Sequence, residues 1–257
     1  SIVIGVFRMK SKIVLPYAPI LVESTRSIGY SFESALADII DNSLGKQSTE
    51  VNILFSSKDP QYVAIVDNGT GMSEEELESA MRYGSKSSLE ERDKDDLGRF
   101  GLGLKTASLS QCRKLTVITK QNGEYCAACW DLDHIIAEKD WSLICYTGKE
   151  TETLPFASYL ENYTSGTVVV WQSFDRIVDG ASNPQKVFDE RIECARNHVA
   201  LVFHRYMDNE NIRTRVKISF NNAPVDPIDP FLSTNPATQP LTEQTLRIDG
   251  SLIKVKP

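Results

Sequence analysis

Three short segments decide the fold predicted for this chain: Asp38-Ile-Ile-Asp-Asn42, Asp67-Asn-Gly-Thr-Gly71 and Gly98-Arg-Phe-Gly-Leu-Gly-Leu-Lys105. The first places a carboxylate and an amide four residues apart, on one face of a helix. The second is an Asp-x-Gly-x-Gly turn, and the third is a glycine-rich loop that runs into a helix. In this order, the three segments indicate a pocket that holds a nucleotide together with Mg2+.

Hydrophobic periodicity and capping residues place these segments on a mixed framework of helices and strands. Ser31 is the predicted N-cap of a helix, and Ser73 with Glu76 has the spacing of a capping box. Everything before this first helix is expected to be extended. Helices are predicted over residues 32–44, 102–111 and 184–207, and strands over residues 51–55, 62–66, 115–119, 125–130, 167–171 and 215–220.

The polar residues of the first two segments have defined chemical uses. The amide oxygen of Asn42 can bind Mg2+, and Asp38, one turn away, can activate a water for attack on the γ-phosphate. Asp67, at the end of a strand, can accept a hydrogen bond from the exocyclic amine of adenine, while Gly69 and Gly71 let the backbone approach the base. Taken singly, each segment also fits an ordinary exposed helix face or a plain β-turn.

The third segment has the features of a phosphate-binding loop. Its glycines free the backbone to wrap phosphates, and the helix that follows presents its N-terminal amides to an anion. Positive charge is available from Lys105 in the first turn of that helix and from Lys86 in the polar stretch 84–96, which is predicted to be a mobile loop. The spacing fits neither a Walker loop nor a dinucleotide-binding fold.

The composition limits the classes of protein to which this chain can belong. The 257 residues are 41% hydrophobic and carry a net charge of −7, so no global attraction to nucleic acid or to an anionic membrane is expected. No apolar run reaches the length of a membrane span. Five scattered cysteines favour a reducing, cytoplasmic compartment. Cys126 and Cys129 lie on opposite faces of a predicted strand, which favours buried structural cysteines over a metal pair.

The segments resemble the nucleotide motifs of the GHKL superfamily of ATPases, which includes DNA gyrase, the large heat-shock chaperone, histidine kinases and mismatch-repair MutL. The resemblance extends over roughly residues 25–175, with Gly166-Thr167 as the fourth motif. The sequences Ile-Asp-Asn-Ser and Gly-Arg-Phe-Gly-Leu-Gly-Leu-Lys are most similar to those of MORC-like and related prokaryotic ATPases.

This resemblance implies an α+β fold of the Bergerat type, a two-layer sandwich in which a mixed sheet is backed by helices. It implies an ATP-binding domain over residues 1–205, and over residues 206–257 the start of a transducer domain like a ribosomal protein. It also implies Asp38 as the general base, Asn42 as the Mg2+ ligand, and Asp67 with Thr167 at adenine. The residues that it places around ATP are Gly69, Gly71, Met72, Lys86, Gly98, Arg99, Phe100, Gly101, Leu102, Gly103 and Lys105, with residues 84–99 as the lid.

One departure from the family pattern bears on activity. The general base is usually Glu, and Asp38 is shorter by one methylene. The carboxylate therefore retracts by about 1.5 Å, which can cost on the order of 100-fold in rate. We therefore expect slow, Mg2+-dependent ATP hydrolysis. The resemblance implies that this hydrolysis drives lid closure and head dimerisation.

Two other functions stay open. An ATP-sensing interaction module with little turnover is the main alternative, and a histidine kinase acting on another chain is a further one. The resemblance to MORC and MutL implies a DNA-linked process, with DNA contacted through regions outside this chain, and no membrane partner.

Overall fold

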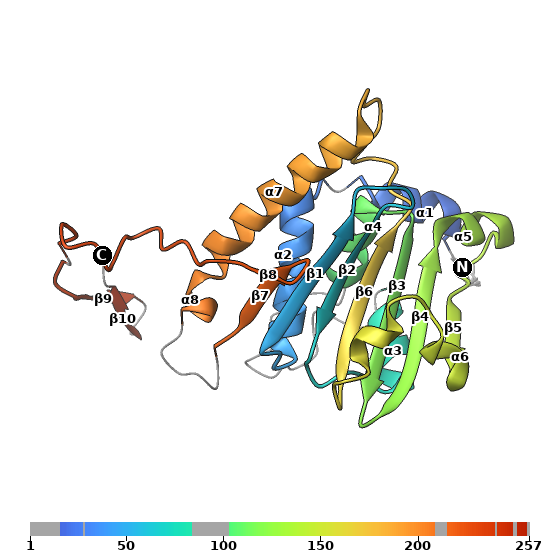
Figure 1. The fold of residues 1–257 in the computed structure, drawn as a ribbon, viewed down its shortest axis with the longest axis horizontal. Helices are drawn as coiled ribbons and strands as arrows, with labels where there is room; N and C mark the ends of the chain where they lie inside the picture. The colour runs from blue at the N-terminus through green and yellow to red at the C-terminus, as the bar shows by residue number, and fades with distance from the viewer. Residues whose placement is uncertain are drawn as a thin grey trace, which may run out of the picture.

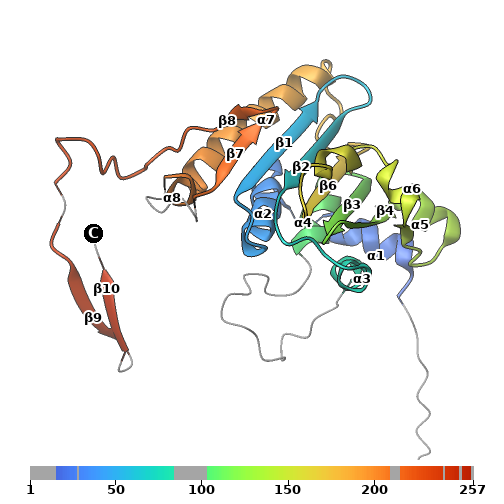
Figure 2. The ribbon, with the colours of Figure 1, turned by 60° about the horizontal axis from the view of Figure 1, so that its bottom comes forward.

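A computed structural model describes residues 16–27, 29–83, 103–208, 215–239, 241–248 and 251–255. Within these residues the chain forms one eight-stranded sheet, in the order β5-β4-β3-β6-β2-β1-β7-β8, and a separate two-stranded sheet (Figures 1 and 2). The large sheet contains β1 (Glu50–Ser56), β2 (Tyr62–Asp67), β3 (Lys114–Gln121), β4 (Glu124–Asp131), β5 (Ile144–Thr147), β6 (Gly166–Gln172), β7 (Lys217–Phe220) and β8 (Ala223–Pro224). The small sheet contains β9 (Gln244–Ile248) and β10 (Ser251–Val255).

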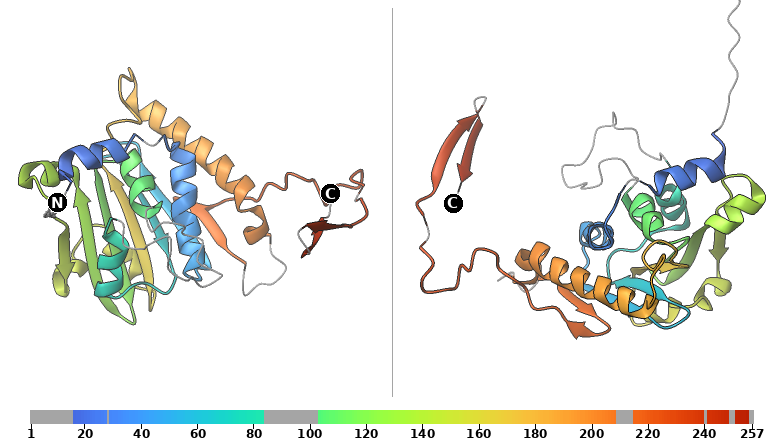
Figure 3. Two further views of the ribbon diagram at one scale, coloured as in Figure 1. Left: turned by 180° about the vertical axis from the view of Figure 1, so that it is seen from behind. Right: turned by 90° about the horizontal axis from the view of Figure 1, so that it is seen from above.

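The sheet is mixed, because β7 runs parallel to β1 while the other neighbouring strands are antiparallel. Helices cover one of its faces, as seen from behind in the left view of Figure 3. The predicted α+β class, a mixed sheet backed by helices, is therefore confirmed. The helical elements are α1 (Ala18–Thr25), α2 (Phe32–Gly45), α3 (Glu74–Met81), α4 (Gly103–Gln111), α5 (Leu132–Glu138), α6 (Lys149–Glu152), the 3-10 turn η1 (Ala157–Leu160), α7 (Pro184–Val202) and α8 (His204–Met207).

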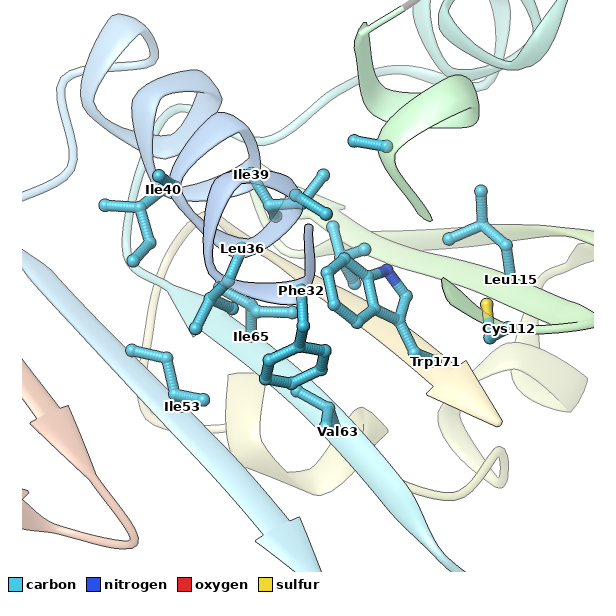
Figure 4. Close-up of a cluster of buried hydrophobic side chains, with 14 of the residues drawn as sticks. Phe32, Leu36, Ile39, Ile40, Ile53, Val63, Ile65, Cys112, Leu115 and Trp171 are labelled. Carbon is cyan, nitrogen blue, oxygen red and sulfur yellow. The ribbon is translucent and has the colours of Figure 1, made fainter. Parts of the chain in front are cut away.

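The core lies between α2 and the centre of the sheet. Phe32, Leu36 and Ile39 of α2 point down onto Ile65 and Trp171 of the strands beneath (Figure 4). Phe32 meets Trp171 edge to face, with ring centroids 5.9 Å apart. Burying side chains of this size contributes about 1.5–3 kcal/mol each, so this contact fixes α2 and the polar residues that it carries.

Local sequence signals account for most of the boundaries. The Oγ atoms of Ser31 and Ser73 accept from the backbone N–H three residues on, and the Ser73–Glu76 capping box is complete. Asn122 and Gly123 have φ of 52° and 91°, the positive values that a tight hairpin turn between β3 and β4 requires. Both predicted caps and the predicted hairpin are confirmed.

The two cysteines of β4 are buried, as their alternation along a strand predicted. Cys126 belongs to the helix-facing core, and both Cys126 and Cys129 have free thiols. Burial raises the pKa of Cys126 to about 11. The thiol therefore stays protonated near neutral pH, which suits a structural side chain rather than a metal ligand.

Two expectations about helices are wrong. The stretch before residue 31 is not wholly extended, because α1 lies there, with Pro19 in its first turn and Ala18 and Val22 buried. The long helix does not run unbroken to residue 207: α7 ends at Val202, and Phe203 turns the chain into α8. Phe203 is buried, so packing of its ring fixes the break. No helix among the described residues is long and apolar enough to cross a membrane.

Candidate nucleotide-binding site

Three polar side chains form a row across the middle of the sheet. Asp67 of β2 is paired with Thr167 of β6, and Thr167 is paired in turn with Thr119 of β3. Two residues further along the same strands, Ile65 and Val169 belong to the helix-facing core. Because side chains two apart on a strand share a face, the row lies on the side of the sheet that α2 covers.

Asp67 is the one ionisable member of the row, with only 5% of its surface exposed. Its Oδ1 accepts from the backbone N–H of Gly69 at 2.9 Å, and its Oδ2 accepts from the Ser43 hydroxyl at 2.8 Å. Burial raises the pKa of this carboxyl, while hydrogen bonds from Gly69, Ser43 and neighbouring groups oppose the rise. The carboxylate is thereby held in one orientation at the end of β2.

The threonines are tied to the turn that follows Asp67. The hydroxyl of Thr119 accepts from the N–H of Met72 at 2.9 Å and donates to the carbonyl of Gly166 at 3.1 Å. It lies 3.4 Å from the hydroxyl of Thr167. Met72 is half-buried. The row and the turn are therefore one hydrogen-bonded unit.

Within that turn the glycines have a packing role. Gly71 has φ of +65°, and a Cβ at this position would lie 2.0 Å from the carbonyl oxygen of Lys120. A Cβ on Gly69 would lie 2.8 Å from the carbonyl oxygen of Lys46. The turn thus packs backbone to backbone against β3 and the end of α2, which only glycine permits.

The predicted catalytic face of α2 carries a second carboxylate. Asp38 and Asp41 are half-buried and Asn42 is exposed, one turn after Asp38. Burial, and then the charge of Asp38, raise the pKa of Asp41. Amide and carboxylate oxygens are the donors that Mg2+ accepts, and this ion takes few protein ligands. The side chains present therefore fit Mg2+, with Asn42 as the most open donor.

Lys105 has a different position from the one expected of a phosphate ligand. Its side chain is fully buried, and its Nζ donates to the carbonyl oxygen of Ala80 in α3 at 2.6 Å. Burial lowers the pKa of this amine to about 8. In this structure Lys105 joins α4 to α3, and a contact with phosphate stays a prediction. Gly103, at the start of α4, is exposed.

Other predicted residues lie outside the described part of the chain. These are Lys86, Gly98, Arg99, Phe100, Gly101 and Leu102, together with the predicted lid. Of the predicted residues that are described, Asp38 and Asn42 lie on α2, and Asp67 and Thr167 lie on β2 and β6. The hydroxyl of Ser43, the residue after Asn42, joins α2 to Asp67.

Sequence reasoning missed several side chains of the site. Ser43 follows Asn42 directly, on the buried side of α2, and that position was its only signal. Thr119 could have been found from its place opposite Thr167 in the paired strands. Asn68 accepts at Oδ1 from the N–H groups of Thr49 and Glu50, both at 2.9 Å, so it fixes the start of β1.

Comparison with known proteins shows the family to which this chain belongs. A family model for histidine kinase-, DNA gyrase B- and HSP90-like ATPases matches residues 30–167. This range includes α2, the turn after Asp67 and the start of β6. The chain therefore belongs to this ATPase family, the GHKL superfamily inferred from its motifs.

Individual relatives match over shorter segments. The chain is 30% identical to ATPase morc-1 of Caenorhabditis elegans over 91 residues, which is 35% of this chain and 10% of that protein. It is 29% identical to the mismatch repair protein MutL of Rickettsia canadensis over 91 residues, and 31% identical to that of Staphylococcus carnosus over 94 residues. Each match spans 35% of this chain, and 15% and 14% of those two proteins.

Proposed function

We propose that this chain binds ATP with Mg2+ and hydrolyses it slowly, using the energy of binding to close over the nucleotide. The observation that carries the proposal is the row of Asp67, Thr167 and Thr119, which lies under the helix that bears Asp38 and Asn42. A buried carboxylate fixed by two donors still has lone pairs for the amine of adenine. Membership of an ATPase family supports the same reading.

The role that we propose for each side chain of the site follows from how far that side chain is buried. Asp67 is buried and suits recognition of a neutral base, whereas Asn42 is exposed and suits the charged phosphates. Mg2+ held by Asn42 would neutralise phosphate charge. Asp38, four residues earlier on the same face, is the group that would accept a proton from the attacking water.

Calorimetric titration of MgATP into the purified chain tests the binding claim. We expect one site per chain in the wild type and at least a tenfold loss of affinity in Asp67→Asn, because the amide presents a donor where adenine also donates. Asp226→Asn, at an exposed position, is the matched control. Equal affinity in Asp67→Asn and the control would contradict the assignment of Asp67 to adenine.

Steady-state hydrolysis separates an ATPase from an ATP sensor. Asp38→Asn should keep MgATP affinity and lose turnover, because it removes the base and leaves the pocket. Asp38→Glu should raise the rate, since the longer side chain restores the missing methylene. A pure sensor would show a negligible rate in the wild type and no gain in Asp38→Glu, and that result would favour the alternative function.

The same proposal includes a dimer and a DNA-linked role, both inferred by analogy with other members of the family. GHKL heads of the gyrase and MORC type dimerise on ATP, and we propose that this chain does so. A DNA-linked role is proposed by analogy with the MutL and MORC relatives, with DNA contacted outside this chain. Light scattering with and without a non-hydrolysable ATP analogue tests the dimer: an unchanged mass at saturating analogue contradicts it.

A further inference from the structure

Thr119 of β3 is the most deeply buried member of the polar row. The residue is 0% exposed, whereas Thr167 beside it is 9% exposed. A ligand that reaches the row can therefore touch Thr167 and not Thr119. Any effect of Thr119 on such a ligand passes through the groups that its hydroxyl holds in place.

The hydroxyl of Thr119 holds two backbone groups that come from different elements. It accepts from the N–H of Met72 at 2.9 Å and donates to the carbonyl oxygen of Gly166 at 3.1 Å. A threonine hydroxyl has one proton and two lone pairs. One lone pair therefore remains for the hydroxyl of Thr167, which lies 3.4 Å away.

Both backbone groups adjoin Asp67. Met72 follows the turn that begins at Asp67, and within that turn the N–H of Gly69 donates to the Asp67 carboxylate at 2.9 Å. Gly166 packs so closely that a Cβ added to it would lie 2.4 Å from the Asp67 carbonyl oxygen. Thr119 thus holds both the turn after Asp67 and the strand beside it.

We propose that Thr119 is a positioning residue for recognition of the base. It fixes the Asp67 carboxylate for the exocyclic amine of adenine and does not touch the nucleotide itself. The inference rests on the proposed ATP-binding function and deepens it. The orientation of the carboxylate depends on the N–H of Gly69, and a turn released from β3 would let that N–H move. Binding groups keep their geometry only when a second layer of hydrogen bonds supports them.

Two substitutions separate the hydroxyl of Thr119 from its shape. Thr119→Val keeps the branched side chain and removes both hydrogen bonds, whereas Thr119→Ser keeps the hydroxyl and removes only a methyl group. We expect the Kd for MgATP to rise about tenfold in Thr119→Val and to stay within about threefold of the wild type in Thr119→Ser. Thr116→Val, on the same strand but on its opposite face, is the matched control and should leave the Kd unchanged.

A ligand without the amine shows whether Thr119 acts through Asp67 or only supports the fold. Purine riboside 5′-triphosphate is ATP without its exocyclic amine, so Asp67 has no amine to recognise on it. Thr119→Val should weaken binding of this analogue by less than about threefold, although it weakens MgATP binding about tenfold. Equal losses for the two ligands would overturn the proposal, because that pattern describes a structural residue. Unchanged MgATP affinity in Thr119→Val, or an equal loss in Thr119→Ser, would also overturn it.

Amide hydrogen exchange, measured without nucleotide, keeps this test separate from the proposed function. The N–H groups of Gly69 and Met72 should exchange at least about tenfold faster in Thr119→Val than in the wild type, because the turn opens more often. Unchanged exchange overturns the hold of Thr119 on the turn. If exchange rises but the wild type binds no MgATP, the proposed function fails, and the role in base recognition fails with it while the hold on the turn stands.

Discussion

At the scale of single residues, the candidate site contains one deeply buried carboxylate, that of Asp67. Asp67 is held by the hydroxyl of Ser43 and the N–H of Gly69, yet burial still raises its pKa. A carboxyl whose folded pKa lies above its unfolded value binds protons more tightly in the folded state, so folding gains stability as pH falls. The polar row therefore costs stability at neutral pH, which is expected where groups are arranged for a ligand.

This linkage predicts a pH-dependent difference between the wild type and Asp67→Asn. The free energy of unfolding of the wild type, minus that of the variant, should become more positive as pH is lowered from about 7 to about 4.5. The variant has no titrating group at this position, so its free energy of unfolding lacks this increase at low pH. Urea unfolding at several pH values measures it, with Asp226→Asn as the control. A difference that is constant across the range would contradict the raised pKa.

Glycine is needed at position 71 for two reasons: its backbone has a positive φ, and it packs closely against Lys120. Gly71→Ala would bring a Cβ to 2.0 Å from the carbonyl oxygen of Lys120, at a φ of +65°. We expect destabilisation by at least about 2 kcal/mol. Gly123→Ala is the control, because Gly123 has φ of +91° but open space around it, and it should cost about 1 kcal/mol. Equal losses in chemical denaturation would show that the close approach contributes nothing.

At the scale of elements, α1 is attached through a buried guanidinium. Arg26 is 1% exposed at its side chain, and it pairs with Asp175 beyond β6 at 2.5 Å and donates to the carbonyl oxygen of Leu109 in α4 at 2.7 Å. Glu23 and Arg113 extend the pair into a cluster. One side chain thus joins α1, the end of α4 and the segment after β6.

Asp175→Asn should therefore destabilise the fold by about 3 kcal/mol, because it leaves a buried guanidinium with its main countercharge gone. Glu78→Gln is the matched control: its partner Arg82 is exposed, at 2.8 Å, and surface pairs of this kind contribute less than about 1 kcal/mol. Thermal unfolding of the two variants measures the contrast. Similar melting temperatures would mean that water reaches Arg26 and replaces Asp175.

Helices α3 and α4 are joined by a lysine whose charge opposes folding. Burial lowers the pKa of Lys105 from 10.5 to about 8. Between these values the unfolded chain binds more protons, so stability should rise with pH across that window. The wild type should gain stability relative to Lys105→Met between pH of about 8 and about 10.5. Lys186→Met, at an exposed position, is the control, and equal slopes for wild type and Lys105→Met would contradict the lowered pKa.

The elements that sequence could predict are those with local signals. Caps at Ser31 and Ser73, the Asn122-Gly123 turn and alternating strands are encoded within a few residues, and all are confirmed. The α1 helix has no side-chain cap and is held by Arg26, whose partner Asp175 is distant in sequence. Ser43 was missed for the same reason, because its hydrogen bond to Asp67 forms only after α2 packs on the sheet.

At the scale of the whole molecule, the sheet extends beyond the predicted end of the first domain at residue 205. β7 pairs in parallel with β1, and Ile218 and Phe220 are buried in the same core as α2. Arg196 of α7 lies over the ring of Phe220, with its guanidinium carbon 4.8 Å from the ring centroid. A transducer-like unit over residues 206–257 stays a prediction, but β7 and β8 belong to the same sheet as β2 and β6, which carry Asp67 and Thr167.

This integration predicts where the chain can be shortened. A chain that ends after Asp208 loses β7 and the buried side chains Ile218, Phe220 and Val225. Each contributes about 1.5–3 kcal/mol when fully buried, and the sum is comparable with the 5–15 kcal/mol that stabilises a typical domain. We therefore expect no cooperative thermal transition and no MgATP binding.

A chain that ends after residue 234 is the matched control, since it keeps β7 and β8 and removes only β9 and β10, which pair with each other. It should unfold cooperatively, within a few degrees of the full chain, as followed by circular dichroism. If the chain ending after Asp208 melted at the same temperature as this control, β7 would be an accessory strand. The parallel pairing with β1 would then contribute nothing to the stability of the nucleotide site.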